Sequence, residues 1–271
     1  ANRERPFFLY LAQAMPGSCA FAFASPAFRG KSANSVYGDA VEELDWSAGE
    51  VLRTLGELGL DRDTLVIWTS DNGAVRHDPP QGSNAPLRGW GYDTSEGGQR
   101  VPCLMRWPGV IPSGRETDEV ATMMDILPTA ARLAGGAPPA DRTLDGRDLY
   151  ALMTGAPGAR SPYDAEGFFY YYREQLQAVR AGEWKLYLPL ERKLNNLAGD
   201  FSRAAPCPAA LYDLRSDIGE TRECSAEHPE VVRRLMALAE SARRELGDCD
   251  RPGSGQRPAG WVEHPTPRLL E

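Results

Sequence analysis

Two oxygen-bearing side chains stand side by side in the first third of this 271-residue chain. Asp71 and Asn72 come just after the apolar run at residues 64–69, and Gly73 follows them. A carboxylate beside an amide offers the hard oxygen ligands that Ca²⁺ or Mg²⁺ prefers. Because open α/β sheets bind ligands beyond the carboxyl ends of their strands, this position predicts a divalent-cation site. Asp-Asn-Gly is also a common turn, so the pair alone leaves a structural role open.

Two further side chains follow in the same loop. His77 comes six residues after Asp71 and could approach a ligand, although a solvated loop histidine is the ordinary alternative. Arg88 could contact an anion, or it could simply brace the loop. We therefore predict Asp71 and Asn72 as metal ligands and His77 and Arg88 as substrate-binding candidates, and we assign no catalytic residue.

Hydrophobic periodicity predicts the elements that must position these residues. Apolar residues at three- and four-residue steps indicate one long helix over residues 36–58, which Gly59 can end. Continuous apolar runs indicate buried strands at residues 6–12, 64–69 and 101–107. Strand, helix and strand in succession are typical of a β-α-β unit. The predicted class is therefore α/β, with a mostly parallel sheet flanked by helices.

The pattern changes beyond residue 165. A short helix at residues 121–134, interrupted at Pro128, precedes a connecting segment rich in Gly and Pro. Short strands are then expected at residues 168–172, 176–180, 184–188 and 211–214, followed by a helix over 229–246. These elements predict a small antiparallel sheet with one helix. The predicted organisation is an α/β core over residues 1–150, the antiparallel-sheet subdomain over 151–250, and an extended tail over 251–271.

Composition narrows the function classes. Lys and Arg number 30 against 38 Asp and Glu, for a net charge of −8, so the chain lacks the basic field that non-specific nucleic-acid binding requires. No apolar run approaches the roughly 18–20 residues of a membrane span, so none is predicted. Five cysteines without CxxC spacing and three histidines argue against a Cys/His zinc site. Localisation stays open.

Several short blocks occur in a characteristic order. They include Pro6–Ala12, Tyr37–Asp45, Val66–Gly73, Pro86–Gly89, Glu96–Pro102, Arg106–Gly109, Met124–Thr129, Leu144–Asp148, Leu211–Leu214 and Gly219–Glu220. In this order and spacing, the chain resembles the type I sulfatases, the arylsulfatase-like members of the alkaline phosphatase superfamily. The blocks match roughly the second half of a family member, so the resemblance implies the carboxyl-terminal part of a sulfatase with an incomplete core.

The resemblance implies hydrolysis of a sulfuric ester. In the family, a formylglycine made from Cys or Ser in a C/S-x-P-x-R motif attacks sulfur, and a divalent cation neutralises the sulfate oxygens. Asp71 and Asn72 match family metal ligands, with Ca²⁺ as the first expectation and Mg²⁺ as the alternative. Sulfate esters are the implied substrate class, and the particular substrate is not readable from this sequence.

The chain departs from the family where chemistry is done. No C/S-x-P-x-R motif occurs, so formylglycine has no host residue here. Gln13 stands where the family has a catalytic histidine, and Gly91 stands where it has a lysine. We therefore expect an incomplete active site and no activity from this chain alone. Two alternatives stay open: a non-catalytic binding or scaffold subunit that pairs with a separate amino-terminal half, and a metal-dependent phosphoesterase of the same superfamily.

Overall fold

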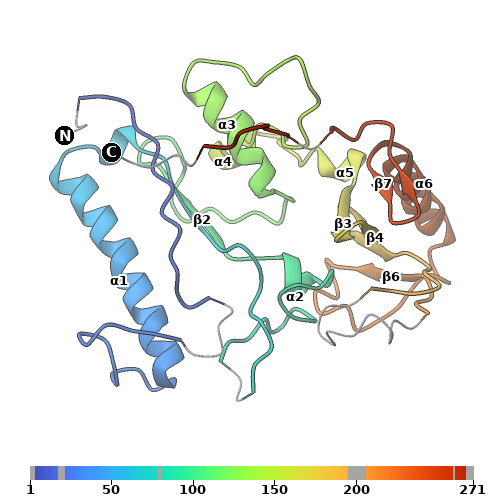
Figure 1. Ribbon diagram of the computed structural model, residues 1–271, viewed down its shortest axis with the longest axis horizontal. Helices are drawn as coiled ribbons and strands as arrows, with labels where there is room; N and C mark the ends of the chain where they lie inside the picture. The colour runs from blue at the N-terminus through green and yellow to red at the C-terminus, as the bar shows by residue number, and fades with distance from the viewer. Residues whose placement is uncertain (1–3, 18–21, 79–80, 195–205, 259, 267–271) are drawn as a thin grey trace.

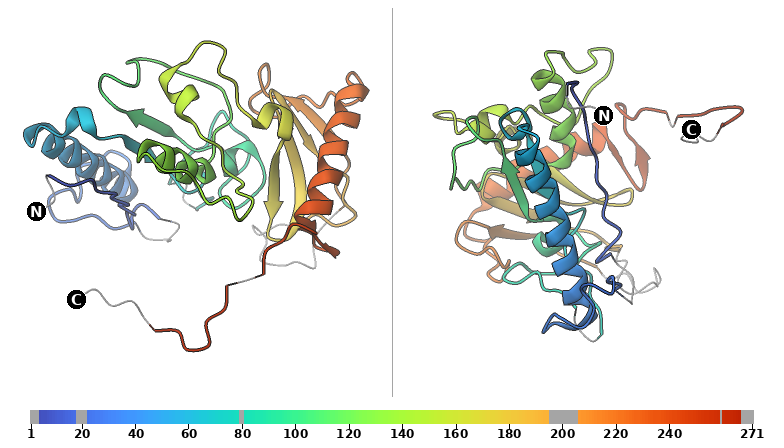
Figure 2. Two further views of the ribbon diagram at one scale, coloured as in Figure 1. Left: turned by 90° about the horizontal axis from the view of Figure 1, so that it is seen from above. Right: turned by 90° about the vertical axis from the view of Figure 1, so that its left-hand side faces the viewer.

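The computed structural model describes residues 4–17, 22–78, 81–194, 206–258 and 260–266. One half of the molecule holds a long helix, a two-stranded sheet and long loops, and the other half holds a four-stranded sheet covered by a helix (Figure 1). Figure 2 shows the long helix and the covered sheet at opposite ends of the molecule.

The first half contains the predicted long helix, α1. The helix runs from Ser35 to Glu57, and Gly59 follows with a φ of +68°, the left-handed conformation that ends helices at glycine. The remaining elements of this half are η1 (Asp61–Asp63), β1 (Val66–Thr69), α2 (Glu96–Gln99), β2 (Cys103–Arg106), η2 (Met123–Asp125), α3 (Ile126–Leu133) and α4 (Tyr150–Thr154). The predicted interruption near Pro128 takes the form of a 3₁₀ turn, η2, that leads into α3.

The second half confirms the predicted small antiparallel sheet with one helix. Its elements are α5 (Tyr163–Glu166), β3 (Phe168–Tyr172), β4 (Gln175–Ala181), β5 (Trp184–Tyr187), β6 (Ala210–Asp213), α6 (Pro229–Glu245), β7 (Gly247–Asp248) and β8 (Arg251–Pro252). Strands β3 to β6 are hydrogen-bonded in chain order, each antiparallel to the next. Pro229 begins α6 at the first helical position, where its missing N–H costs nothing.

The best-formed core lies between the four-stranded sheet and α6. Leu176, Leu186 and Leu211 of the sheet meet Leu235 and Ala239 of the helix, and all five have no exposed surface. The opposite face of the same sheet is also buried, but it carries tyrosines: Tyr170, Tyr187 and Tyr212. A sheet buried on both faces is a rigid platform for whatever packs against its tyrosine face.

Two expectations about strands differ from the structure. Residues 6–12 form no strand, and this apolar segment is exposed, with Phe8 78% and Tyr10 82% accessible. An apolar run becomes a strand only where a neighbouring strand completes its hydrogen bonds, and the described chain places none beside it. In addition, β1 pairs with β2 in antiparallel register, and no described strand pair is parallel. The α/β class itself holds. Among the described residues, no helix is long and apolar enough to cross a membrane.

Candidate active site

Asp71 and Asn72 lie at the carboxyl end of β1, as predicted. Thr69 ends the strand and donates its hydroxyl to the Pro102 carbonyl at 3.0 Å, which fastens the end of β1 to the chain leading into β2. The backbone then bends, and Asn72 N–H donates to Asp71 Oδ1 at 2.9 Å. This short bond orients the carboxylate at the tip of the strand. Asp71 is exposed and Asn72 is half-buried.

Glycine is required directly after this pair. Gly73 N–H donates to the Gly98 carbonyl at 3.1 Å, and a Cβ on Gly73 would lie 1.7 Å from the Gly97 carbonyl oxygen. The loop that follows is held by Asn84, whose side chain accepts from Ala74 N–H at 2.6 Å and donates back to its carbonyl at 2.9 Å. The long loop between β1 and α2 is therefore closed at its base by backbone contacts.

The donor set at the strand tip fits part of a divalent-cation site. Asn72 Nδ2 donates to the Gly73 carbonyl at 2.9 Å, which leaves the amide oxygen as the side chain's ligand atom. Asp71 supplies a carboxylate beside it. A Ca²⁺ ion takes six to eight oxygen ligands, and no group of three or more His, Cys, Asp or Glu side chains converges anywhere in the described ranges. Asp71 and Asn72 could therefore supply part of a coordination sphere and not the whole of it.

The other two predicted site residues are not brought to this pair. His77 is half-buried in the same loop and forms no hydrogen bond or ion pair with any residue that the structure describes. Arg88 points to the second half of the molecule instead. Its guanidinium lies 5.1 Å from the ring centroid of Tyr187 and 5.0 Å from that of Tyr212, and its Nε lies 3.4 Å from Glu220. These contacts are of the kind expected if Arg88 braces the loop, the alternative given above to contact with an anion.

The two positions that depart from the family have definite surroundings. Gln13 donates its side-chain amide to Ser47 Oγ of α1 at 3.0 Å, so it is turned toward the helix. Gly91 lies next to the candidate ligands: its N–H donates to the Ala74 carbonyl at 2.8 Å, and a Cβ on it would stand 3.1 Å from Asn72 Nδ2. The same Cβ would lie 2.4 Å from the Gly73 carbonyl oxygen, so the present backbone leaves little room for any side chain at residue 91.

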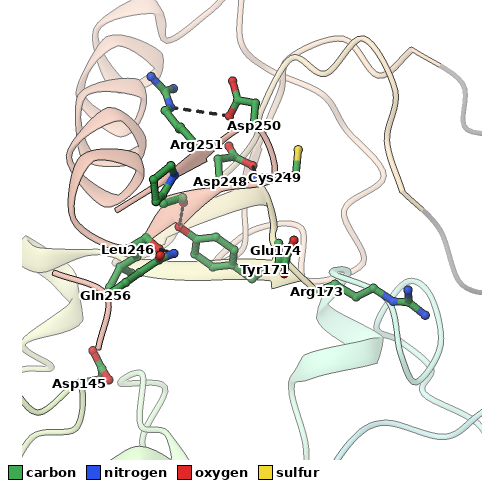
Figure 3. Close-up of a pocket in the computed structure, with 12 residues that line it drawn as sticks. Asp145, Tyr171, Arg173, Glu174, Leu246, Asp248, Cys249, Asp250, Arg251 and Gln256 are labelled. Atoms are coloured by element: carbon green, nitrogen blue, oxygen red, sulfur yellow. Dashed lines mark hydrogen bonds and ion pairs between the residues drawn. The ribbon is translucent and has the colours of Figure 1, made fainter. Parts of the chain in front are cut away.

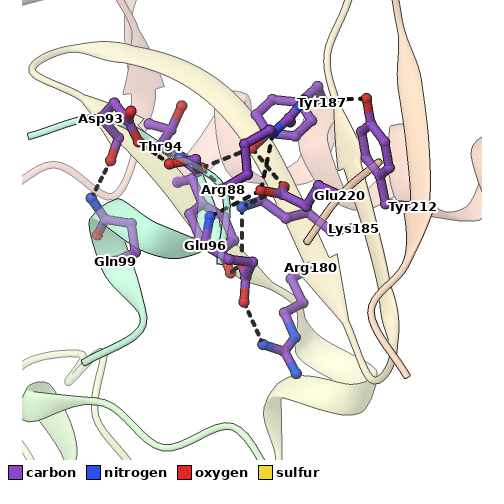
Figure 4. A network of polar contacts seen from close by, with 12 residues as sticks. Arg88, Asp93, Thr94, Glu96, Gln99, Arg180, Lys185, Tyr187, Tyr212 and Glu220 are labelled. Atoms are coloured by element: carbon purple, nitrogen blue, oxygen red, sulfur yellow. Dashed lines mark hydrogen bonds and ion pairs between the residues drawn. The ribbon is translucent and has the colours of Figure 1, made fainter. Parts of the chain in front are cut away.

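A buried network of charges joins the loop to the four-stranded sheet (Figure 4). Lys185 of β5 has no exposed surface, and its Nζ lies 2.9 Å from Glu96 Oε1 and 3.2 Å from Glu220 Oε1. The same ammonium donates to the Thr94 carbonyl at 2.9 Å, and Arg180 of β4 lies 3.1 Å from Glu96. The sequence predicted no role for these residues, although Glu96 and Glu220 lie in two of the blocks that carry the family resemblance. A lone lysine inside an apolar strand was the available signal.

Hydrogen bonds and charge set the protonation of this network. Burial alone would raise the pKa of Glu96, but Lys185 and Arg180 outweigh it and the pKa is lowered. Tyr170 donates its hydroxyl to Glu96 at 2.8 Å, and Tyr187 donates to Glu220 at 2.7 Å. Burial, reinforced by these carboxylates, raises the pKa of both phenols. Glu96 is therefore held as a carboxylate in this network, and the phenols of Tyr170 and Tyr187 stay neutral.

Two cavities border the second half of the molecule. One, of about 410 Å³, opens where residues 88–95 meet the sheet and is bordered by Arg88, Lys193 and several tyrosines. The other, of about 630 Å³, lies beside β7 and β8 (Figure 3). Tyr171 lines it and donates its hydroxyl to the Gly247 carbonyl at 2.8 Å; burial raises the pKa of that phenol to about 12. Ion pairs such as Arg243–Asp248, at 2.8 Å, hold its wall.

Comparison with known proteins agrees with the fold. A family model described as Sulfatase matches residues 1–137, and a second, described as the C-terminal region of aryl-sulfatase, matches residues 164–257. Steryl-sulfatase of Mus musculus is 41% identical over an alignment of 271 residues in length, and the alignment covers 90% of this chain and 43% of that protein. N-acetylgalactosamine-6-sulfatase of Canis lupus familiaris is 41% identical over 186 residues, covering 68% of this chain and 34% of its own length.

Solved structures agree as well. A chain from work on the metabolism of multiple glycosaminoglycans by Bacteroides thetaiotaomicron superposes with a TM-score of 0.75 at 28% identity, covering 89% of this chain and 51% of its own. Another, solved in complex with a neocarrahexaose, gives a TM-score of 0.71 at 25% identity, covering 89% of this chain and 50% of its own.

The fold and these matches define a sulfatase-type α/β protein, and the chain belongs to the sulfatase family. Within that family it corresponds to the carboxyl-terminal region, and it spans about half the length, or less, of the relatives given above. The predicted resemblance and the α/β class with its small antiparallel sheet are thereby confirmed.

Proposed function

We propose that this chain is the carboxyl-terminal part of a sulfuric ester hydrolase and contributes Asp71 and Asn72 to its divalent-cation site. The observation that carries the proposal is the placement of a carboxylate and an amide oxygen together at the open tip of β1, on a loop fixed at both ends. Ca²⁺ is the expected ion, and Mg²⁺ is the alternative. When bound, the ion would neutralise the oxygens of a sulfate ester.

The chain alone is expected to lack turnover. Its 271 residues contain no C/S-x-P-x-R motif and therefore no host for formylglycine. Gln13 cannot replace a histidine in proton transfer, because its amide does not titrate in the useful range. It also bonds to Ser47 of α1 and not to the strand tip. His77 and Arg88 remain candidates for substrate contact, with Arg88 reaching the sheet and not the proposed ion.

A second candidate function is that of a subunit that pairs with a separate amino-terminal half. Apolar side chains gather on the first half of the molecule without cover: Phe8 is 78% exposed, Tyr10 82% and Leu104 of β2 67%. In the described chain, β1 pairs only with β2, so one of its edges is open. An open strand edge beside exposed apolar residues favours the addition of further strands.

Complementation tests both ideas. The chain would be co-expressed with an amino-terminal sulfatase polypeptide that carries the C/S-x-P-x-R motif, and hydrolysis of 4-nitrophenyl sulfate measured with and without Ca²⁺. We expect no turnover from the chain alone and Ca²⁺-dependent turnover from the pair. Asp71→Ala should abolish the turnover of the pair. Asp78→Ala removes an exposed carboxylate from the same loop and should leave that turnover unchanged.

Three results would contradict the proposal: rapid turnover by the chain alone, turnover by the pair that survives Asp71→Ala, or preference for 4-nitrophenyl phosphate over the sulfate. The last result would instead support the phosphoesterase alternative. Co-purification of the two polypeptides, measured before any assay, tests the pairing separately from the chemistry.

A further inference from the structure

One cation that lines the cavity of about 410 Å³, Lys193, has no salt bridge with a described carboxylate. The cavity lies between residues 88–95 and the tyrosine face of the four-stranded sheet. The ammonium of Lys193 borders it, 4.7 Å from the ring centroid of Tyr187, and makes no salt bridge with any residue that the structure describes. Burial lowers the pKa of Lys193, because the ammonium loses water while Cys207 and Asp93 compensate only in part.

The carboxylate of Asp93, which also borders the cavity, is already engaged. It accepts hydrogen bonds from Trp90 N–H at 3.1 Å and from Ser95 N–H at 2.8 Å, and it bonds the Ser95 hydroxyl as well. Arg88, the other cation of the cavity, pairs with Glu220 at 3.4 Å. Lys193 is thus a lining cation that no described carboxylate pairs in a salt bridge, and an anion entering the cavity could pair with it.

The segment that carries Lys193 is fixed to the sheet. Leu194 N–H donates to Gln175 Oε1 at 2.8 Å, and Gln177 Nε2 donates to the Leu194 carbonyl at 2.8 Å. Gln175 and Gln177 are both buried residues of β4. Two hydrogen bonds from the rigid sheet therefore hold Lys193 at the cavity before any ligand arrives, which reduces the entropy lost on binding.

The walls suit a ring that carries hydroxyl groups. Tyr92, Tyr172, Tyr187 and Tyr212 line the cavity, and the aliphatic contribution is small: Leu194, Pro208 and Ala210. Figure 4 shows Tyr187 and Tyr212 on either side of Arg88, which stacks between them. Tyrosines offer flat apolar faces together with hydroxyl groups, whereas a wholly apolar ligand such as a sterol would call for aliphatic walls.

We propose that this cavity binds a sugar ring that carries an anionic group, a sulfate or a carboxylate, with Lys193 as the counter-charge and the tyrosines as the ring platform. The inference rests on the proposed function, since such a ring would belong to the part of a sulfate-ester substrate away from the bond that is cleaved. It adds a substrate class, anionic carbohydrate, and a binding residue, Lys193.

The test is direct binding to the purified chain by calorimetry, with no turnover measured. The probes are N-acetylglucosamine 6-sulfate, unsulfated N-acetylglucosamine, inorganic sulfate and a steroid sulfate. We expect the sulfated sugar to bind best and Lys193→Gln to weaken it at least tenfold, since a hydrogen bond to a charged group contributes about one tenfold step or more. Arg215→Gln is the matched control: it removes an exposed cation, 73% accessible, from the same subdomain and outside the cavity.

Each probe or variant tests one part of the proposal. Equal binding of the sulfated and unsulfated sugars, or unchanged affinity in Lys193→Gln, would overturn the role of Lys193. Inorganic sulfate binding as tightly as the sulfated sugar would overturn the ring platform, and tighter binding of the steroid sulfate would overturn the carbohydrate class. Binding is measured in EDTA, without the cation that Asp71 is proposed to hold, so failure of the cation-site proposal in the complementation assay and failure of this one are distinguishable.

Discussion

Replacing Lys185 by methionine should strongly destabilise the second half of the molecule. The substitution keeps the length of the side chain but removes the ammonium that lies 2.9 Å from Glu96 and 3.2 Å from Glu220. Each of the three side chains is at most 1% exposed. The carboxylates of Glu96 and Glu220 would then stay in the interior without this ammonium. The free energy lost when they leave water would be offset less, so the folded state would be less stable.

The structure sets the size of the effect. Breaking a buried ion pair by removing one partner typically costs about 3–5 kcal/mol. Each carboxylate keeps one cation, because Arg180 remains 3.1 Å from Glu96 and Arg88 remains 3.4 Å from Glu220. We therefore expect the lower end, about 3 kcal/mol, which is a large part of the roughly 5–15 kcal/mol by which a domain is stable.

Urea unfolding followed by tryptophan fluorescence measures this change. The control Arg215→Met removes an exposed partner of Glu183, at 3.5 Å, and should cost less than about 0.5 kcal/mol. In a double-mutant cycle, Lys185→Met with Glu96→Gln should be less destabilised than the sum of the single variants by more than about 1 kcal/mol. A Lys185→Met variant within about 1 kcal/mol of the parent, or strict additivity in the cycle, would refute the argument.

Two further predictions concern the same loop. Because the pKa of Glu96 is lowered in the folded chain, its carboxylate stabilises the fold above the ordinary glutamate pKa of 4.5. This stabilisation is lost as the pH falls through the pKa of the folded chain. The urea midpoint of Glu96→Gln should therefore fall less steeply between pH 6 and pH 3 than that of the parent. Restoring the family's lysine with Gly91→Lys should destabilise the chain by about 1–3 kcal/mol, since its Cβ would lie 2.4 Å from the Gly73 carbonyl oxygen; thermal unfolding unchanged from the parent would show that the loop relaxes without cost.

The fold was largely predictable where the sequence carried its own local signals. The helix over residues 36–58 was confirmed as Ser35–Glu57, with Gly59 in the left-handed conformation that ends it. The four strands and final helix of the second half were also placed within one or two residues. The exceptions were residues 6–12, which have a strand's composition but no partner among the described residues, and the expected parallel pairing, since β1 and β2 are antiparallel. Composition reports the preference of one segment, whereas pairing depends on a second segment that may lie far away in the sequence.

The candidate site was predictable only in part. Asp71 and Asn72 lie at a strand tip because the strand and the glycine after them are local features. Whether they bind a metal stays a prediction. Arg88 reaches Glu220, 132 positions further along the chain, and no periodicity in either segment encodes that pairing. The same holds for Lys193, whose position depends on hydrogen bonds between Leu194 and β4.

The buried network joins the two parts of this chain that the two family models match. Glu96 ends the loop that starts at Asp71, and Lys185 and Glu220 belong to the antiparallel subdomain. Gly97 N–H, next to Glu96, donates to the Arg88 carbonyl at 2.7 Å, and Gly91 within that loop packs against Gly73 and Asn72. A shift of the subdomain would therefore move the loop that touches a candidate ligand. The carboxyl-terminal sheet is in this sense part of the site, since it fixes the loop's far end while β1 fixes its near end.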